Sequence, residues 1–138
     1  SCIWRVRSTS VPEIPSFDFS FRAPFPVVNA KFPDTISKTQ NLTFSIHVAG
    51  ADSLVIGING DSSNFDGYLY KSFIPNQNGN NYTFSVKDYS KIRRSDYFGA
   101  KQAIKIIAYS KAIQDIKGNY MTFMKETTFY GGIWINQK

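Results

Sequence analysis

The chain has 138 residues, a length that suits one domain rather than two. Apolar residues make up 42% and charged residues 19%, a balance that provides a hydrophobic core and argues against disorder. The net charge of +6 comes from scattered lysines and arginines, and there is no basic run of the kind that forms a nucleic-acid-binding tail. No apolar stretch reaches the roughly 18 residues of a membrane-spanning helix.

Residues 1–16 are expected to form an N-terminal arm or tether, because Pro12 and Pro15 disfavour regular structure around them. The alternative is that the apolar side chains of this arm dock on the domain, namely Ile3, Trp4 and Val6. Residues 17–138 are expected to form a single β-sandwich domain.

Apolar residues that recur at every second position predict strands along most of the chain. The most regular stretch is 41–50, where four apolar residues alternate with polar ones, and 102–112 is its expected partner across the core. Further strands are expected at 17–23, 26–32, 53–58, 68–74, 82–86, 120–128 and 129–135. The high aromatic content of 16% also favours β structure.

Turn signals separate these strands. The Asn- and Gly-rich segment 75–81 is expected to join its two flanking strands in a hairpin, and Gly131-Gly132 suggests a bulge or bend. The segment 88–99 has helical character and predicts a short crossover. The predicted fold is therefore an all-β antiparallel sandwich of about 7–9 strands with one short helical crossover.

The sequences AYSKA at 108–112 and DIKGN at 115–119 resemble the closing hairpin of bacterial immunoglobulin-like domains. In that group a strand ends in an A-x-D-x-x-G-N turn and the final strand follows, with a shorter spacing than here. The resemblance implies an immunoglobulin-like sandwich from a bacterial envelope or surface protein that acts as a spacer or binding module. The Cys…Trp…Cys core of antibody domains is absent.

The chain has one cysteine, Cys2, so an intrachain disulfide is excluded. Ser1-Cys2 resembles the end of the lipobox of bacterial lipoproteins, in which the cysteine becomes acylated. The resemblance implies lipidation at Cys2 and a location at a bacterial membrane. The alternative is an incidental free thiol, since a mature lipoprotein begins at the cysteine itself.

The sequence offers little support for catalysis. The single histidine, His47, selects no nucleophile or orienting acid, and one histidine with one cysteine cannot form a closed zinc site. Asp61 and Asp66 are close in sequence, as the two carboxylates of a glycosidase could be. They lie in a loop, however, and a flexible loop holds such a pair poorly. We expect no enzymatic activity, no cofactor and no metal.

One oxygen-rich loop, 61–67, only partly matches a calcium-binding loop. Its register places Ser62, Asn64 and Asp66 at the first three ligand positions. Phe73 then occupies the position where a bidentate glutamate is needed. An ordinary turn rich in Asp and Asn is the expected structure.

The expected partner-binding residues combine aromatic rings with cations. They are Trp4 in the arm, Arg93, Arg94, Tyr97 and Phe98 in the crossover, and Trp134 in the apolar C-terminal stretch. Burial of the crossover rings against the sandwich, and pairing of the C-terminal stretch as the last strand, are the structural alternatives.

The leading hypothesis is a non-enzymatic lipoprotein or other protein of the bacterial cell envelope, in the periplasm or on the outer-membrane surface. It would be a structural or accessory subunit, or a protein-binding module in an envelope assembly. Membrane contact is expected only through a lipid anchor, and no nucleic acid is expected. The alternative is a carbohydrate-binding module that holds a surface glycan with exposed aromatic rings. Coplanar exposed rings in a groove would favour a glycan, whereas an apolar patch or an ordered arm would favour a protein partner.

Overall fold

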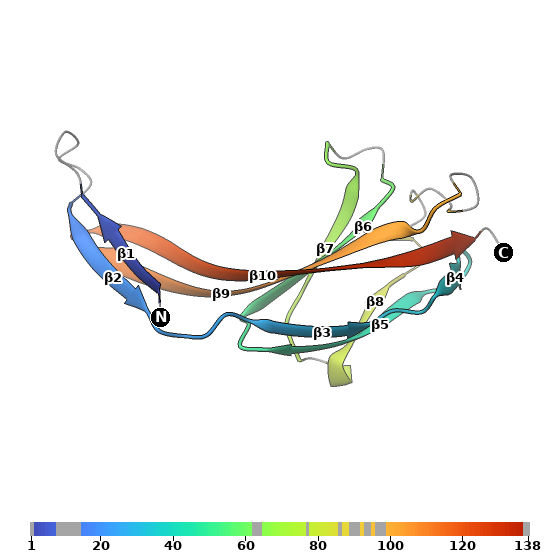
Figure 1. The fold of residues 1–138 in the computed structure, drawn as a ribbon, viewed down its shortest axis with the longest axis horizontal. Coiled ribbons are helices and arrows are strands. Elements are labelled where there is room, and N and C mark those ends of the chain that lie inside the picture. Colours follow the sequence, from blue (N-terminus) through green and yellow to red (C-terminus); the bar gives the residue numbers. More distant parts are fainter. Residues whose placement is uncertain are drawn as a thin grey trace.

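The computed structural model describes residues 2–7, 15–61, 65–76, 78–85, 87–88, 92, 95 and 99–136. The fold is all-β, as predicted (Figure 1). These residues contain ten strands and one 3-10 turn: β1 (Cys2–Val6), β2 (Phe17–Phe21), β3 (Val27–Lys31), β4 (Thr35–Ser37), β5 (Leu42–Ala49), β6 (Ser53–Asn59), β7 (Tyr68–Phe73), η1 (Asn78–Asn80), β8 (Asn81–Phe84), β9 (Gln102–Ile116) and β10 (Asn119–Asn136).

Two sheets form the layers of a sandwich. One has the strand order β4-β10-β9-β6-β7 and the other has the order β3-β5-β8. In β5 every second side chain is buried, from Leu42 to Val48, and the intervening ones are exposed. The buried side chains of β5 join those of β6 and β9 in one core. Burying each of these large apolar side chains contributes about 1.5–3 kcal/mol, so the two layers are held together mainly by this interface.

The β9–β10 hairpin is longer than the sandwich. The two strands pair from Asn119↔Ile116 to Ile133↔Gln102, whereas β6 pairs with β9 only between Ile104 and Tyr109. The closed end of the hairpin therefore extends past the rest of the five-stranded sheet (Figure 1). We call residues 110–125 together with β1 and β2 the arm. It differs from the N-terminal arm expected at residues 1–16, because it includes the closed end of the hairpin and β2.

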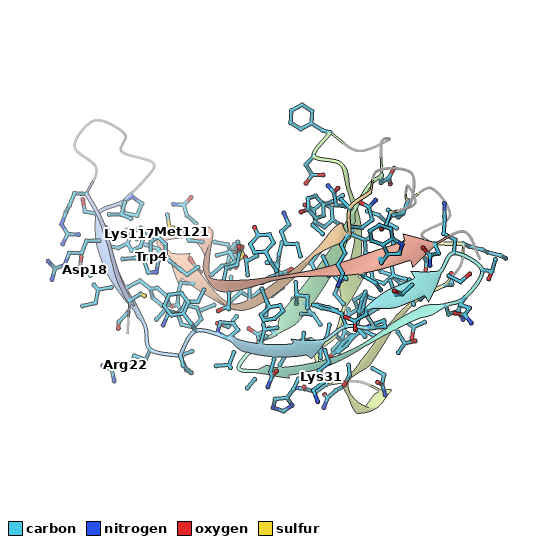
Figure 2. The ribbon with its side chains drawn as sticks, turned by 45° about the vertical axis from the view of Figure 1, so that its right-hand side comes forward. Trp4, Asp18, Arg22, Lys31, Lys117 and Met121 are labelled. Carbon is cyan, nitrogen blue, oxygen red and sulfur yellow. The ribbon has the colours of Figure 1, made fainter. Side chains whose placement is uncertain are left out.

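The two-stranded β1–β2 sheet covers one face of this extension. The Phe19 ring stacks on Phe123 at 4.2 Å between centroids, and the Trp4 and Phe17 rings lie 5.6 and 6.1 Å from Phe123. Figure 2 shows Trp4 and Met121 at this end of the molecule, with Asp18 pointing away from it. The arm thus has a small aromatic cluster of its own, separate from the sandwich core.

The predicted hairpin across 68–86 is wrong. β7 pairs with β6, and β8 pairs with β5, so the two strands belong to different sheets. Phe73 contacts Tyr82 and Phe84 edge-on, at 5.4 and 5.8 Å between ring centroids. Phe73 at the end of β7 and the two aromatic residues of β8 therefore pack across the core, and their strands do not pair side by side.

A bulge at the glycine pair was expected from the sequence and is corrected. Pairing between β9 and β10 continues without interruption through Gly131 and Gly132, so the glycine pair makes no bulge within these described strands. Most of the segment 88–99, where a short helical crossover was expected, lies outside the described residues. The sequence also did not predict β1 or β4, and β4 pairs in parallel with the end of β10.

Candidate binding surfaces

The predicted partner-binding residues do not come together at one place. Arg93, Arg94, Tyr97 and Phe98 lie outside the described residues. Trp4 packs on Phe123 in the arm, whereas Trp134 is half-buried near the far end of β10, where its Nε1 donates a hydrogen bond to Asn136 Oδ1 at 2.5 Å. Position 134 is eleven residues beyond position 123 along the strand, about 35 Å at the usual rise.

Cys2, the predicted lipidation site, is half-buried in β1 and lies opposite Phe21 of β2. Side chains alternate between the two faces of a strand. The thiol therefore shares the face of β1 that carries Trp4 and Val6, which is the face turned toward β10.

The uncovered face of the arm carries exposed apolar side chains. Ile113 is 60% exposed, Met124 53% and Tyr120 78%. Ile113 lies opposite Thr122, so Tyr120 and Met124 are its two diagonal neighbours on β10. These three side chains form one patch, which we call the arm patch. It lies on the face opposite to the one covered by β1 and β2.

A second group of side chains lies on the outer face of the five-stranded sheet, the face turned away from β3-β5-β8. The rings of Tyr68 and Tyr70 are 5.7 Å apart and inclined by only 21°. Lys105 of β9 places its Nζ 4.7 Å from the Tyr68 centroid and 5.2 Å from the Tyr70 centroid. Tyr130 of β10 lies opposite Lys105 and is 65% exposed. We call Tyr68, Tyr70 and Lys105 the tyrosine platform.

Gly57 of β6 lies opposite Tyr70 and leaves room for its ring. A Cβ atom added at Gly57 would lie 2.7 Å from Tyr70 Cε1, closer than real carbon contacts allow. Glycine in the interior of a strand often marks such a close approach. The absence of a side chain at Gly57 therefore sets how near the Tyr70 ring lies to the sheet.

Hydrogen bonds fix the platform and its charges. Tyr70 Oη donates to Asp66 Oδ2 at 2.5 Å, and the Tyr68 backbone N–H donates to Asp66 Oδ1 at 3.1 Å. These bonds hold the pKa of Asp66 below its usual value, and the bond to Asp66 raises the pKa of Tyr70. Hydrogen bonding with the Tyr70 side chain raises the pKa of Lys105. At neutral pH the site therefore carries an ionised carboxylate and an ammonium group.

A shallow pocket of about 480 Å³ lies next to the platform along the same strands. Its lining combines hydroxyl groups with apolar surface and consists of Ser53, Leu54, Ser72, Phe73, Ile74 and Tyr109. Ser72 is two residues beyond Tyr70 on β7, roughly 7 Å along the strand. The platform and the pocket thus form one continuous surface.

The described part of the chain does not bring His47, Asp61 and Asp66 together in a catalytic arrangement. His47 is exposed on β5, in the other sheet. Asp61 is buried, while Asp66 is bonded to Tyr70 and Tyr68. Residues 62–64 of the oxygen-rich loop lie outside the described part of the chain. Within the described ranges, no group of three or more His, Cys, Asp and Glu residues could hold a metal ion.

No protein-family model, curated protein or solved structure matches this chain. Among the described residues, no helix is both long and apolar enough to cross a membrane.

Proposed function

We propose that the chain is a non-enzymatic protein-binding module of the bacterial cell envelope and that the arm carries its contact surface. The observation that supports this proposal is the arm patch, in which three large apolar side chains are exposed on an ordered hairpin that projects from the sandwich. Exposed apolar patches rimmed by polar residues are typical of protein-interaction sites.

The shape of the arm favours a protein partner over a small molecule. The arm patch lies on an open strand pair, and the lining of the described pocket includes none of its residues. Ile3, on the outward face of β1, is also 60% exposed, so both layers of the arm present apolar surface. Burying one such side chain at an interface would contribute about 1.5 kcal/mol or more.

The strand order supports the immunoglobulin-like part of the proposal. In that fold, strands A, B and E lie in one sheet and strands G, F and C lie in the other. The orders β3-β5-β8 and β10-β9-β6 follow the same sequence of strands. Domains of this kind on bacterial surfaces are spacers or binding modules, in keeping with the resemblance of residues 108–119 to their closing hairpin.

A lipid on Cys2 would anchor the protein to a membrane of the envelope, whereas a periplasmic location would not need one. Cys2 is the first residue of β1 and is half-buried, so its thiol lies at the end of the β1–β2 pairing. Intact-mass analysis of the N-terminal peptide from the native protein tests this point. An acylated Cys2 supports the membrane location, and an unmodified thiol overturns it without affecting the binding proposal.

The binding proposal is tested with a photo-crosslinking amino acid placed in the source bacterium. At Thr122, beside Ile113 in the arm patch, we expect a crosslink to one envelope protein. At Ser45, exposed on the outer side of β5, we expect none. Equal crosslinking from the two positions would contradict the assignment of the surface to the arm.

The purified partner then allows a matched comparison. Ile113→Ser in the arm patch is expected to weaken binding about tenfold, which corresponds to about 1.4 kcal/mol. Ile74→Ser is the control, because Ile74 is 61% exposed, compared with 60% for Ile113, and lies off the arm at the end of β7. Equal affinities of the two variants would refute the proposal.

A further inference from the structure

We infer that the outer face of the five-stranded sheet is a second binding site, in which the tyrosine platform holds an acidic polysaccharide built of hexuronic acid residues. The site lies on the sandwich, whereas the arm patch lies on the hairpin extension. The two surfaces use different residues, so this inference does not depend on the proposed protein-binding function.

The rings of the platform are held in place for stacking. Sugar rings present C–H groups on their faces, and aromatic rings with a fixed orientation are the surfaces on which apolar faces pack best. Tyr70 is 38% exposed, lies close above Gly57, and is tied through its hydroxyl to Asp66. The Tyr68 and Tyr70 rings are inclined by only 21° and the Lys105 ammonium lies over both, so a sugar would pack on the ring surface beside this ammonium group.

The charge of the platform favours an anionic sugar. Lys105 is held by two ring faces, and no ion pair joins its Nζ to a carboxylate of the described residues. Asp66 lowers the net charge nearby, but its oxygens already accept hydrogen bonds from Tyr70 and from the Tyr68 backbone. A uronate carboxylate would therefore meet an ammonium group that, among the described residues, interacts with Asp66 only through a charge interaction and forms no direct ion pair. The net charge of +6 acts in the same direction.

The extent of the surface favours a polymer over a single sugar. Tyr130 lies on one side of Lys105, and the pocket with its Ser53, Ser72 and Tyr109 hydroxyls lies beyond Tyr70 on the other. Hydroxyl groups at a partly apolar surface are suited to orienting a ligand through a few hydrogen bonds. Successive sugar residues of one chain could thus contact the platform and the pocket together.

The test uses retardation of the whole purified protein in native gels that contain polygalacturonate, with fully methyl-esterified polygalacturonate as the neutral counterpart of the same backbone. We expect retardation by the acid form that weakens as NaCl is raised, because salt screens exposed charges. We expect little retardation by the ester. Equal retardation by the two polymers, or none by the acid form, would overturn the inference.

Two variants assign the effect to the platform. Lys105→Gln is expected to weaken binding about tenfold, the effect of losing one good charged contact. Lys31→Gln removes the same charge from an exposed position of β3 in the other sheet and is expected to leave binding unchanged (Figure 2). Equal losses in the two variants would mean that only net charge matters, and the site assignment would be wrong.

Tyr70→Phe and Tyr70→Ala separate ring stacking from folding. The phenylalanine variant keeps the ring and should retain most of the binding, whereas the alanine variant should lose it. If Tyr70→Ala does not fold, Gly57→Ala, which pushes against the Tyr70 ring, replaces it with the same expected loss. Undiminished binding by a folded variant of either kind would refute the stacking role. Ile113→Ser should bind polygalacturonate normally, because the arm patch is a separate surface.

Discussion

Lys125 Nζ donates a hydrogen bond to the backbone carbonyl oxygen of Phe21 at 2.6 Å and so joins β10 to a strand 104 residues earlier in the chain. It also donates to the carbonyl oxygen of Ala23, and it lies 4.8 Å from the Phe21 ring and 5.4 Å from the Phe25 ring. The residue is only 3% exposed. A buried ammonium group is tolerated only where polar partners replace water. These carbonyl groups therefore help to fix where β2 lies on β10.

Replacing Lys125 with methionine is expected to loosen the β1–β2 sheet from the arm. The change keeps an unbranched side chain but leaves two largely buried carbonyl groups without a donor, at a cost of about 1–3 kcal/mol. Hydrogen exchange of the β1 and β2 amides measures the loss, since exchange reports local opening. Lys111→Met, on the exposed face of the same hairpin, is the control. Equal protection of the amides in both variants would contradict this role for Lys125.

The neighbouring glycines Gly131 and Gly132 should respond oppositely to alanine. A Cβ atom at Gly131 would lie 2.2 Å from Phe32 Cε2, and Phe32 packs edge-on against Phe44 in the core. Gly131→Ala should therefore destabilise the protein by about 1–3 kcal/mol. At Gly132 the nearest side-chain atom is 3.5 Å away, and alanine should be neutral or stabilising by about 0.5 kcal/mol. The denaturant concentration at the midpoint of unfolding measures the stability of each variant, provided that the dependence of the unfolding free energy on denaturant is unchanged. Equal midpoints for the two variants would refute the packing explanation.

The strands themselves could be predicted from the sequence because alternation reports which face of a strand is buried. The alternation from Leu42 to Val48 correctly marked the core side of β5. Alternation does not report which strand is the neighbour, and for this reason the β7 and β8 pairing was predicted wrongly. Lys125 illustrates the same limit, since its burial depends on Phe21 and Ala23, which are more than 100 residues away.

The candidate surfaces were harder to predict than the fold. The predicted crossover residues were cations and rings adjacent along the chain, and they lie outside the described residues: Arg93, Arg94, Tyr97 and Phe98. The platform instead gathers Tyr70 and Lys105 from β7 and β9, which do not pair with each other but flank β6. Only the strand register places them together. The available signal was the Tyr68-x-Tyr70 spacing, which puts both rings on one face of a strand.

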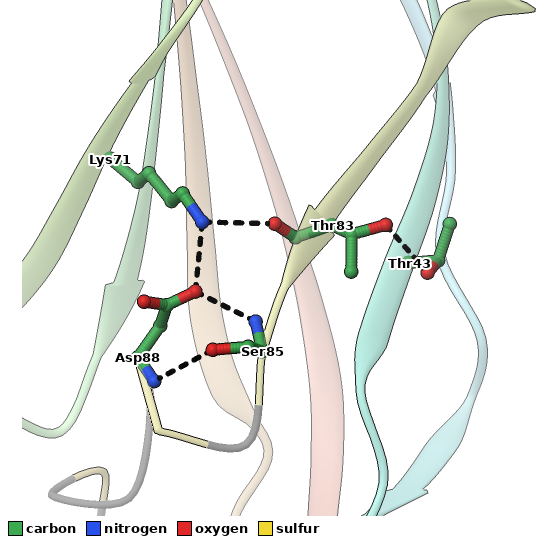
Figure 3. A network of polar contacts seen from close by, with 5 residues as sticks. All are labelled: Thr43, Lys71, Thr83, Ser85 and Asp88. Carbon is green, nitrogen blue, oxygen red and sulfur yellow. Dashed lines mark hydrogen bonds and ion pairs between the residues drawn. The ribbon is translucent and has the colours of Figure 1, made fainter. Parts of the chain in front are cut away.

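A polar network between the two sheets should make stability depend on pH. Lys71 Nζ of β7 contacts Asp88 Oδ2 at 2.8 Å and the Thr83 carbonyl oxygen of β8 at 3.2 Å (Figure 3). The bonds from Lys71 and from the Ser85 backbone N–H hold the pKa of Asp88 below its usual value. A carboxylate of this kind stabilises the fold above its unfolded pKa, and the effect is lost as the pH falls through the lower folded pKa.

The test compares Asp88→Asn with the natural chain between pH 7 and pH 2. Both side chains of the pair are about one-third exposed, at 33% and 37%, so solvent screens the interaction. The variant should be less stable at pH 7 by about 0.2–1 kcal/mol, the range of exposed ion pairs. This difference should shrink once the pH falls below about 4, where an unfolded aspartate becomes protonated. A difference that stays constant down to pH 2 would exclude ionisation of Asp88 as its source.

The hydrogen bond from Tyr70 to Asp66 should control the titration of the Asp66 carboxyl group. Tyr70→Phe removes the hydroxyl donor but keeps the ring, so the pKa of Asp66 should rise toward its ordinary value. Carboxyl-carbon NMR of Asp66 across acidic pH measures the change directly. Tyr120→Phe, on the exposed arm patch, removes an equivalent hydroxyl far from the loop and should leave the Asp66 titration unaltered. Identical titrations in the natural chain and in Tyr70→Phe would mean that this hydroxyl does not hold Asp66 in solution, and the platform would then lack the contact that fixes the Tyr70 ring.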